Sequence, residues 1–277
     1  MYGYATFDLK ARHIDQVFRI QVATPVGYEA DPDASYPLMY VTDGDLSFGL
    51  AATCMMLGSM DLIDPGVSPA IVVGIGYDTP LEMGVIRVRD LTPENSVDDW
   101  FAESYVQTAG RRAESGGADA FIEFIVNELH PEILNRFRVA GDTAALMGDS
   151  YGGLFTFYNL LKGTPLFDRL WVGSPGVLGC GHYLLDQLPE RLERGFEVPT
   201  RVYGSLGELE RTGSIGGVLE QEIYQDLADS YAVIDAALSA YEGPNFVYAS
   251  REFEGETHSS VVPAAFSQAY RFLMRND

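Results

Sequence analysis

A glycine-flanked serine is the residue of this chain whose setting best suits chemistry. It lies in the run Gly148-Asp149-Ser150-Tyr151-Gly152, between an apolar, strand-like segment at 144–147 and a helix-like stretch. Gly-x-Ser-x-Gly in that context is typical of a nucleophile elbow, a strained turn that exposes the serine hydroxyl above a sheet edge. A side chain at Gly148 or Gly152 would collide with neighbouring elements. The alternative is an ordinary glycine-rich turn, because such pentapeptides also arise by chance.

His258 is the candidate base for this serine. Of the four histidines it alone follows the last expected strand, in the loop before the C-terminal helical pattern. The chain order serine, acid, histidine is the order found when a strand-turn-helix serine is catalytic. A neutral imidazole there could take the Ser150 proton and return it to a leaving group. The alternative is a surface-loop or capping histidine.

The acid that would orient His258 is expected after the strand ending near Gly204. The segment Gly207-Glu208-Leu209-Glu210 offers two carboxylates. The acid must accept the second imidazole N–H and so fix the tautomer. Glu210 is the first choice and Glu208 the second, and a solvated loop carboxylate is the competing interpretation of either.

An oxyanion hole needs two backbone N–H groups aimed at the developing charge. One is expected from Tyr151, the residue after the nucleophile. The turn Asp43-Gly44-Asp45 follows an apolar run at 37–42, and the N–H of Asp45 is the second candidate. An ordinary Asp-Gly turn is the alternative.

The elements that must position these residues alternate along the chain. Period-two patterns predict antiparallel strands at 5–10 and 16–22, and short apolar runs predict buried strands. Helical spacing appears between them, with Pro131 expected to kink or break one helix. This alternation indicates an α/β fold with a mostly parallel central sheet and helices on both faces. The expected buried strands are at 37–42, 69–75, 144–147, 170–174, 200–204 and 245–252, and the helices at 47–60, 121–133, 219–241 and 262–273.

Length and composition favour one large α/β domain over residues 1–277, with no linker or repeat. Residues 77–117 are rich in charge, Pro and Gly, which predicts an irregular lid or pocket-forming insertion. Within it, Trp100, Phe101 and Tyr105 could form a lid or pocket wall.

The charge balance excludes several classes of partner. With 18 Lys and Arg against 40 Asp and Glu, the formal net charge is −22. Such a field repels nucleic acids and anionic membranes.

There is no apolar run long enough to span a bilayer and no secretory signal, so a cytoplasmic protein is expected. The histidines and the two cysteines show no ligand spacing, so no metal and no organic cofactor is expected. The sequence leaves the oligomeric state open.

With these motifs in place, the chain resembles the Putative esterase family of α/β-hydrolases, which includes esterase D-like enzymes, siderophore esterases, feruloyl esterases and mycolyltransferases. The likeness runs from about residue 17 to 273. It rests on residues 36–44, the segment Arg87-Val88-Arg89-Asp90-Leu91-Thr92-Pro93, and residues 116–121, 148–153, 174–175, 207–210 and 258–263. The resemblance implies an α/β-hydrolase fold and esterase chemistry.

The resemblance also suggests a substrate-binding arginine at Arg87, whose fork could grip an anionic or oxygen-rich substrate. The alternative is an Arg87 or Arg89 paired with Asp90 to fix the loop. Two departures concern the pocket. Asp149 stands where the family usually has histidine, and Gly176-Val177-Leu178 replaces an aromatic segment. Asp149 and Trp100 therefore join Arg87 as candidate substrate-binding residues.

The sequence thus predicts a serine carboxylic-ester hydrolase that forms an acyl-enzyme on a small to medium ester. An acyltransferase or a peptidase could use the same residues. A non-catalytic binding protein on the same fold is the third possibility.

Overall fold

The computed structural model describes residues 3–79, 82–93, 102–103, 105–106, 109–177, 182–212 and 221–276. Within them, an eight-stranded sheet has the order β1-β2-β4-β3-β5-β6-β7-β8. The strands are β1 (Gly3–Lys10), β2 (Val17–Thr24), β3 (Tyr36–Val41), β4 (Ile71–Tyr77), β5 (Val139–Asp149), β6 (Phe167–Gly173), β7 (Thr200–Gly207) and β8 (Phe246–Phe253).

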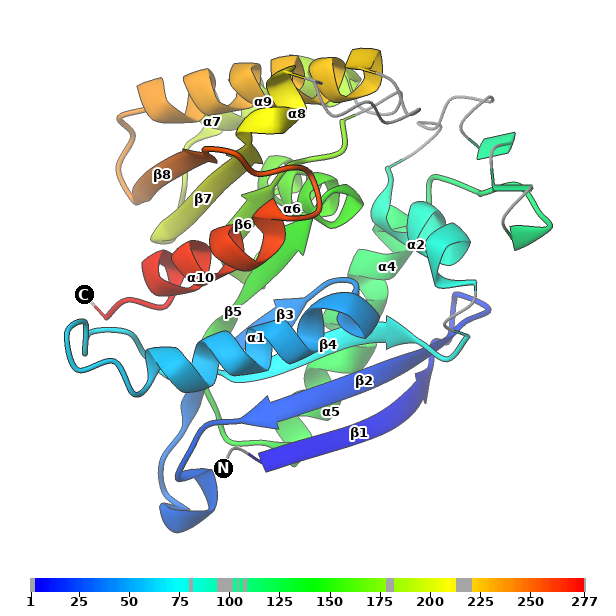
Figure 1. Cartoon of the computed structure of the whole chain (residues 1–277). Coiled ribbons are helices and arrows are strands. Elements are labelled where there is room, and N and C mark those ends of the chain that lie inside the picture. Colours follow the sequence, from blue (N-terminus) through cyan, green and yellow to red (C-terminus); the bar gives the residue numbers. More distant parts are fainter. Residues whose placement is uncertain are drawn as a thin grey trace.

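Helices cover both faces of this sheet, with α1 and α10 in front of it and α4, α5 and α6 behind it in Figure 1. The helices are η1 (Tyr28–Ala30), α1 (Gly44–Gly58), α2 (Met83–Leu91), α4 (Ala118–Phe124), η2 (Ile125–Leu129), α5 (His130–Arg136), α6 (Tyr151–Lys162), α7 (His182–Arg194), α8 (Glu208–Thr212), α9 (Gln221–Ala240) and α10 (Val261–Leu273). No helix in the described part of the chain has the length and apolar character needed to cross a bilayer.

Strand direction confirms the predicted fold class. β2 pairs antiparallel with β1 and with β4, whereas β3 to β8 pair in parallel. The carboxyl ends of parallel strands meet at one edge of a sheet, which is where open α/β sheets place their ligands. The loops after β3, β5, β7 and β8 therefore share that edge.

The two faces of the sheet build two hydrophobic cores, and β5 contributes to both. Ala144 and Leu146 pack into the core that includes Phe155 of α6, while Ala145 and Met147 pack into the core that includes Phe266 of α10. This division follows from the period-two alternation of a strand that is buried on both sides. Odd-numbered positions near the end of β5 thus face α1 and α10.

One local expectation was wrong in part, because the sequence predicted that Pro131 would kink or break a helix. Pro131 breaks no helix, because a π-helical turn at Ile125–Leu129 precedes it and places it in the first turn of α5, where its missing N–H is tolerated. Within residues 77–117, where the sequence predicts an irregular lid or pocket-forming insertion, the described part contains α2, which buries Val85, Ile86, Val88 and Leu91.

Candidate active site

Ser150 stands in the strained turn between β5 and α6. Its backbone has φ 60° and ψ −123°, a region that side chains other than glycine rarely adopt. Its N–H donates to the Gly173 carbonyl at 3.0 Å. A Cβ on Gly148 would lie 2.2 Å from the Gly152 carbonyl oxygen, and one on Gly152 would lie 2.3 Å from Thr42 Oγ1. The two flanking glycines are therefore required by the close approach of backbone and side chain.

A third glycine, outside the pentapeptide, brings α6 against β6. A Cβ on Gly153 would lie only 2.0 Å from the carbonyl oxygen of Gly173. The same carbonyl accepts the Ser150 N–H, so the nucleophile turn and the first turn of α6 are both held against the end of β6.

His258 and Glu210 form a direct contact at the carboxyl edge. The Nδ1 atom of His258 lies 2.7 Å from Glu210 Oε2. The other oxygen, Oε1, accepts the Ser174 hydroxyl at 2.7 Å and the Gly207 N–H at 2.8 Å. Glu210 is only 2% exposed, so its carboxylate is buried but fully supplied with donors. This is the arrangement that orients an imidazole.

The environment of His258 favours its protonated form. Burial lowers the pKa of His258, but the hydrogen bond to Glu210 and the charges of Asp149 and Glu210 outweigh burial and raise it. The ring of Tyr224 in α9 lies beside it, with 5.5 Å between the ring centroids. An imidazolium formed at this position would be stabilised by nearby negative charge.

Glu208 points elsewhere. Its Oε2 accepts the N–H of Gly255 at 2.8 Å, in the turn after β8. The structure thus brings Glu210, and not Glu208, to His258.

The turn after β3 is held by a buried ion pair. Asp43 has φ 53°, and its carboxylate receives two hydrogen bonds from Arg87, from Nε at 2.6 Å and from Nη2 at 2.7 Å. A Cβ on Gly44 would lie 2.8 Å from backbone atoms of β4, and a Cβ on Gly152 would lie 3.3 Å from Asp43 Oδ2. The turn therefore sits against both β4 and the first turn of α6.

Both proposed oxyanion donors belong to helix N-termini at this edge. Tyr151 is the first residue of α6, and Asp45 is the second residue of α1. The Asp45 carboxylate accepts the Tyr77 N–H at 2.8 Å. Burial raises the pKa of the Asp45 carboxyl, and hydrogen bonds from Tyr77 and from its own N–H oppose that rise. The N-terminal ends of two helices favour a developing negative charge here.

Arg87 lies at this edge, but most of its fork is used within the protein. Its Nε and Nη2 bind Asp43, and its guanidinium lies over the Tyr151 ring at 5.3 Å from the centroid. Arg89, by contrast, makes the pairing with Asp90, at 2.7 Å. The structure thus commits Nε and Nη2 of Arg87 to Asp43.

Asp149 ends β5 beside the nucleophile. Its Oδ1 is sealed from solvent and makes no hydrogen bond with any described residue. Burial is the main cause that raises the pKa of Asp149 to about 7. A buried oxygen without a donor is unusual in proteins and asks for an explanation.

Trp100 and Phe101 lie outside the described residues. Tyr105 is described, and the contact of its ring with the Cβ position of Gly84, at 3.8 Å, places it against α2. In the part of the chain that the structure describes, there is no group of three or more His, Cys, Asp or Glu side chains that could hold a metal ion.

Ser174 is a residue of the candidate site that sequence reasoning missed. It is fully buried, has φ 33°, and donates its hydroxyl to Glu210. The Ser174-Pro175 pair was part of the family resemblance, but no sequence pattern indicated that the Ser174 hydroxyl would bind Glu210. The pairing of Asp43 with Arg87 was also missed, because the two residues are 44 positions apart.

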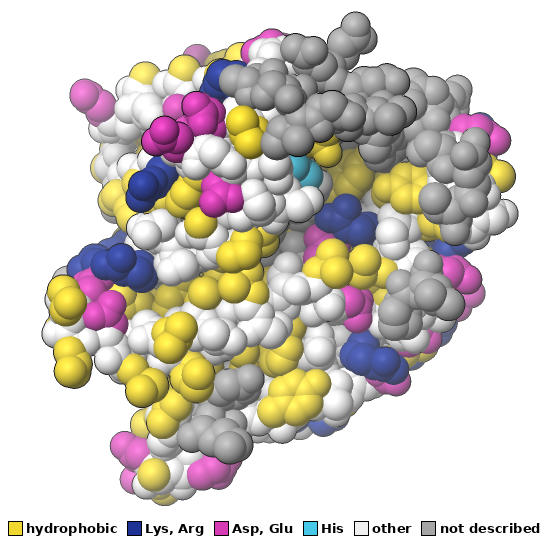
Figure 2. All heavy atoms as spheres, in the orientation of Figure 1, with side chains coloured by type: hydrophobic (Ala, Val, Ile, Leu, Met, Phe, Trp, Pro, Cys, Tyr) yellow, Lys and Arg dark blue, Asp and Glu magenta, His cyan; other side chains and the backbone are white. Residues whose placement is uncertain are grey.

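Figure 2 shows a histidine side chain reaching the surface, with Lys or Arg and Asp or Glu side chains nearby.

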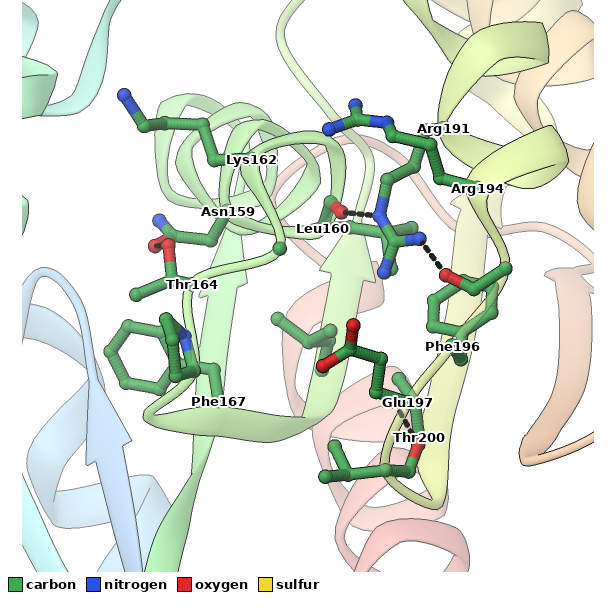
Figure 3. A pocket seen from close by; sticks show the side chains of 15 residues that line it. Asn159, Leu160, Lys162, Thr164, Phe167, Arg191, Arg194, Phe196, Glu197 and Thr200 are labelled. Atoms are coloured by element: carbon green, nitrogen blue, oxygen red, sulfur yellow. Dashed lines mark hydrogen bonds between the residues drawn. The ribbon is translucent and has the colours of Figure 1, made fainter.

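A separate cavity of about 300 Å³ lies near the C-terminal end of α6 and is lined by Arg191 and Arg194 (Figure 3). Arg191 donates to the carbonyls of Leu160 and Gly195, and Arg194 to that of Leu161. These arginines cap the end of α6, and no candidate active-site residue lines this cavity.

The sheet order and the serine turn define the α/β-hydrolase class. Within that class, the chain belongs to the family described as Putative esterase, whose model matches residues 11–180. Comparisons with individual proteins support an enzyme that hydrolyses esters.

The chain is 28% identical over 275 residues to the ferri-bacillibactin esterase BesA of Bacillus subtilis, covering 97% of this chain and 89% of BesA. Among solved structures, the BES protein from Bacillus cereus superimposes with a TM-score of 0.82 at 25% identity, over 99% of this chain and 95% of that one. The siderophore hydrolase EstB from Aspergillus nidulans gives a TM-score of 0.75 at 25% identity, over 98% and 95% of the two chains.

Proposed function

We propose that this protein is a serine esterase that cleaves the ester bonds of a siderophore through an acyl-enzyme. The observation that carries the proposal is the buried Glu210 carboxylate. It is fixed by Ser174 and Gly207 and lies 2.7 Å from Nδ1 of His258. It shares the carboxyl edge of the sheet with the strained Ser150 turn.

In the proposed reaction, Ser150 Oγ attacks the ester carbonyl carbon while Nε2 of His258 accepts its proton. Glu210 keeps the Nδ1 proton in place and stabilises the imidazolium. The N–H groups of Tyr151 and Asp45 donate to the oxyanion, and the Asp45 carboxylate, which also interacts with the Asp45 N–H, has to release it for this. The C–O bond then breaks, the alcohol leaves with the proton from His258, and water repeats the sequence on the acyl-enzyme to release the acid and free Ser150.

The Arg87–Asp43 ion pair stabilises the part of the site that carries the two proposed oxyanion donors. It holds the turn that carries the Asp45 N–H and lies against Tyr151. Because Nε and Nη2 are committed to Asp43, Arg87 would contact an oxygen-rich substrate through Nη1 alone. Arg87 thus combines a structural task with a limited substrate contact.

The substrate class comes from the names of the relatives. BesA is named for ferri-bacillibactin, and EstB is named as a siderophore hydrolase. A siderophore ester is a small molecule that needs no cofactor for cleavage by a serine nucleophile. We infer that the substrate of this chain is also a siderophore ester, and the hydrolysis assay has to identify which siderophore it is.

The test is hydrolysis of a panel that contains a short p-nitrophenyl ester, aryl esters and a cyclic triester siderophore, with Ser150→Ala as the key variant. We expect the wild type to cleave the siderophore with the highest kcat/KM. Ser150→Ala should lose at least about 10³-fold in rate and should not react with a fluorophosphonate probe. Unchanged thermal unfolding of the variant is the control, and turnover undiminished by the substitution rejects the proposal.

A further inference from the structure

Asp149 has no role in the reaction as written, yet it occupies the position next to the nucleophile. Its Oδ1 is sealed from solvent and makes no hydrogen bond with any described residue. A carboxyl in that state costs free energy unless its charge interacts with something nearby. The charged groups around Asp149 therefore have to account for its buried carboxyl.

The backbone directs the Asp149 side chain toward the face that carries α1 and α10. Asp149 follows Ala145 and Met147 at strand period two, and both of those side chains belong to the core on that face. Asp149 pairs with Gly173 of β6. A Cβ on Gly173 would lie 2.8 Å from Asp149 Oδ1 and 2.7 Å from the Trp171 ring. The missing side chain at Gly173 thus makes the room that the carboxyl fills.

The charges of four side chains from separate elements act on this carboxyl. They are His258 in the loop before α10, Glu210 of α8, Arg87 of α2, and Asp43 at the start of α1. Glu210 already binds Nδ1 of His258 through Oε2, and Asp43 already binds Arg87. Of the two cationic partners, Arg87 is thus already paired with a carboxylate, whereas His258 gains charge only when it accepts a proton.

We propose that Asp149 is a positioning residue that acts through His258, its ionised carboxylate stabilising the imidazolium formed when His258 takes the proton of Ser150. The inference rests on the proposed function. It assigns no contact between Asp149 and the substrate, unlike the sequence-based expectation.

Asp149 and His258 each shift the pKa of the other, as the proposed role requires. Burial first, and then the charges of Glu210 and Asp43, raise the pKa of Asp149 to about 7, while His258 and Arg87 act to lower it. The charge of Asp149 in turn raises the pKa of His258. Two groups coupled in this way titrate as a pair. Protonation of His258 during catalysis therefore favours ionisation of Asp149, and the ionised carboxylate favours the imidazolium.

The first experiment measures kcat and KM against pH for wild type, Asp149→Asn and Asp168→Asn. Asp168 is the control because it is also an aspartate of the sheet with a buried Oδ1, but the charge next to that oxygen is Arg169, whose Nε lies 3.2 Å away, and not a histidine. It lies at the opposite end of β6 from Gly173. We expect Asp149→Asn to move the acid limb of kcat/KM to lower pH by about one unit and to lower kcat about tenfold. KM should stay within about twofold.

A merely structural Asp149 would leave the acid limb of the folded variant where the wild type has it, and that result overturns the inference. A similar shift in Asp168→Asn would also overturn it, because the effect would then be a general consequence of removing charge. Asp149→Ser provides a second uncharged side chain of smaller size should the asparagine variant not fold.

The second experiment separates this inference from the proposed function. The His258 imidazole is titrated by NMR, with its resonance assigned by its loss in His258→Gln. We expect its pKa to fall by about one unit in Asp149→Asn. An enzyme inactive on every ester would refute the proposed function while leaving this titration readable. An unmoved His258 pKa in an active enzyme would refute the role of Asp149 alone.

Discussion

Replacing Glu210 by glutamine tests the candidate site most sharply, because the side chain keeps its shape and loses only charge and one acceptor. In the wild type, Oε1 accepts from Ser174 and Gly207, and Oε2 contacts Nδ1 of His258. A glutamine can satisfy Ser174 and Gly207 only if its oxygen faces them. Its NH₂ group then faces Nδ1, and the imidazole has to place its proton on Nε2.

That tautomer cannot accept the Ser150 proton, and the charge that stabilises the imidazolium is gone as well. We expect kcat to fall by about 10³ to 10⁴, which corresponds to about 4 to 5.5 kcal/mol of transition-state stabilisation. Weakening the charged hydrogen bonds to neutral ones should lower the free energy of unfolding by about 1 to 2 kcal/mol. The loss of rate should therefore far exceed the loss of stability.

The assay compares initial rates of p-nitrophenyl ester hydrolysis in Glu210→Gln and Glu208→Gln. Both variants lose one negative charge from α8, but Glu208 binds the Gly255 N–H, and a glutamine oxygen can still accept that bond. We expect Glu208→Gln to change kcat by less than about threefold. A Glu210→Gln enzyme that keeps more than a tenth of the wild-type rate, or an equal loss of activity in both variants, would refute the role assigned to Glu210.

Two further predictions concern stability. The carboxyl of Asp149 has its pKa raised from 3.8 to about 7, so its contribution to stability is fully present below pH 4 and is lost as the pH rises through 7. Between pH 5 and pH 8, the stability of Asp149→Asn relative to wild type in thermal unfolding should rise by about 2.7 kcal/mol, which is two pH units at about 1.36 kcal/mol each; a difference independent of pH would contradict this. Arg87→Met should cost about 3 to 5 kcal/mol in urea unfolding, because it leaves Asp43 buried without its partner, and adding Asp43→Asn should recover part of the loss. Equal stability of the single and double variants would argue against the buried pair.

Local patterns predicted most of the fold. Period-two strands, short apolar runs and helical spacing indicated a mostly parallel sheet with two antiparallel strands, and the structure has them. These patterns succeed because burial on one or both faces of an element leaves a periodic trace in the sequence. The break expected at Pro131 was wrong, since the π-helical turn that precedes Pro131 leaves no such trace.

The sequence by itself determined the Ser150 turn, because glycine is needed wherever backbones approach as closely as they do at Gly148 and Gly152. It also determined the chain order of Ser150, Glu210 and His258. Only the tertiary structure decided which carboxylate contacts His258, because Glu208 and Glu210 differ by half a helical turn in direction and by little else.

The same holds for Ser174, for the Arg87–Asp43 pair and for the burial of Asp149. Each depends on residues that are distant in the chain and meet at one sheet edge, and a single sequence records no such distances. The sequence fixes which groups are present through local sterics and periodicity, whereas the packing of strands and helices decides which of them touch.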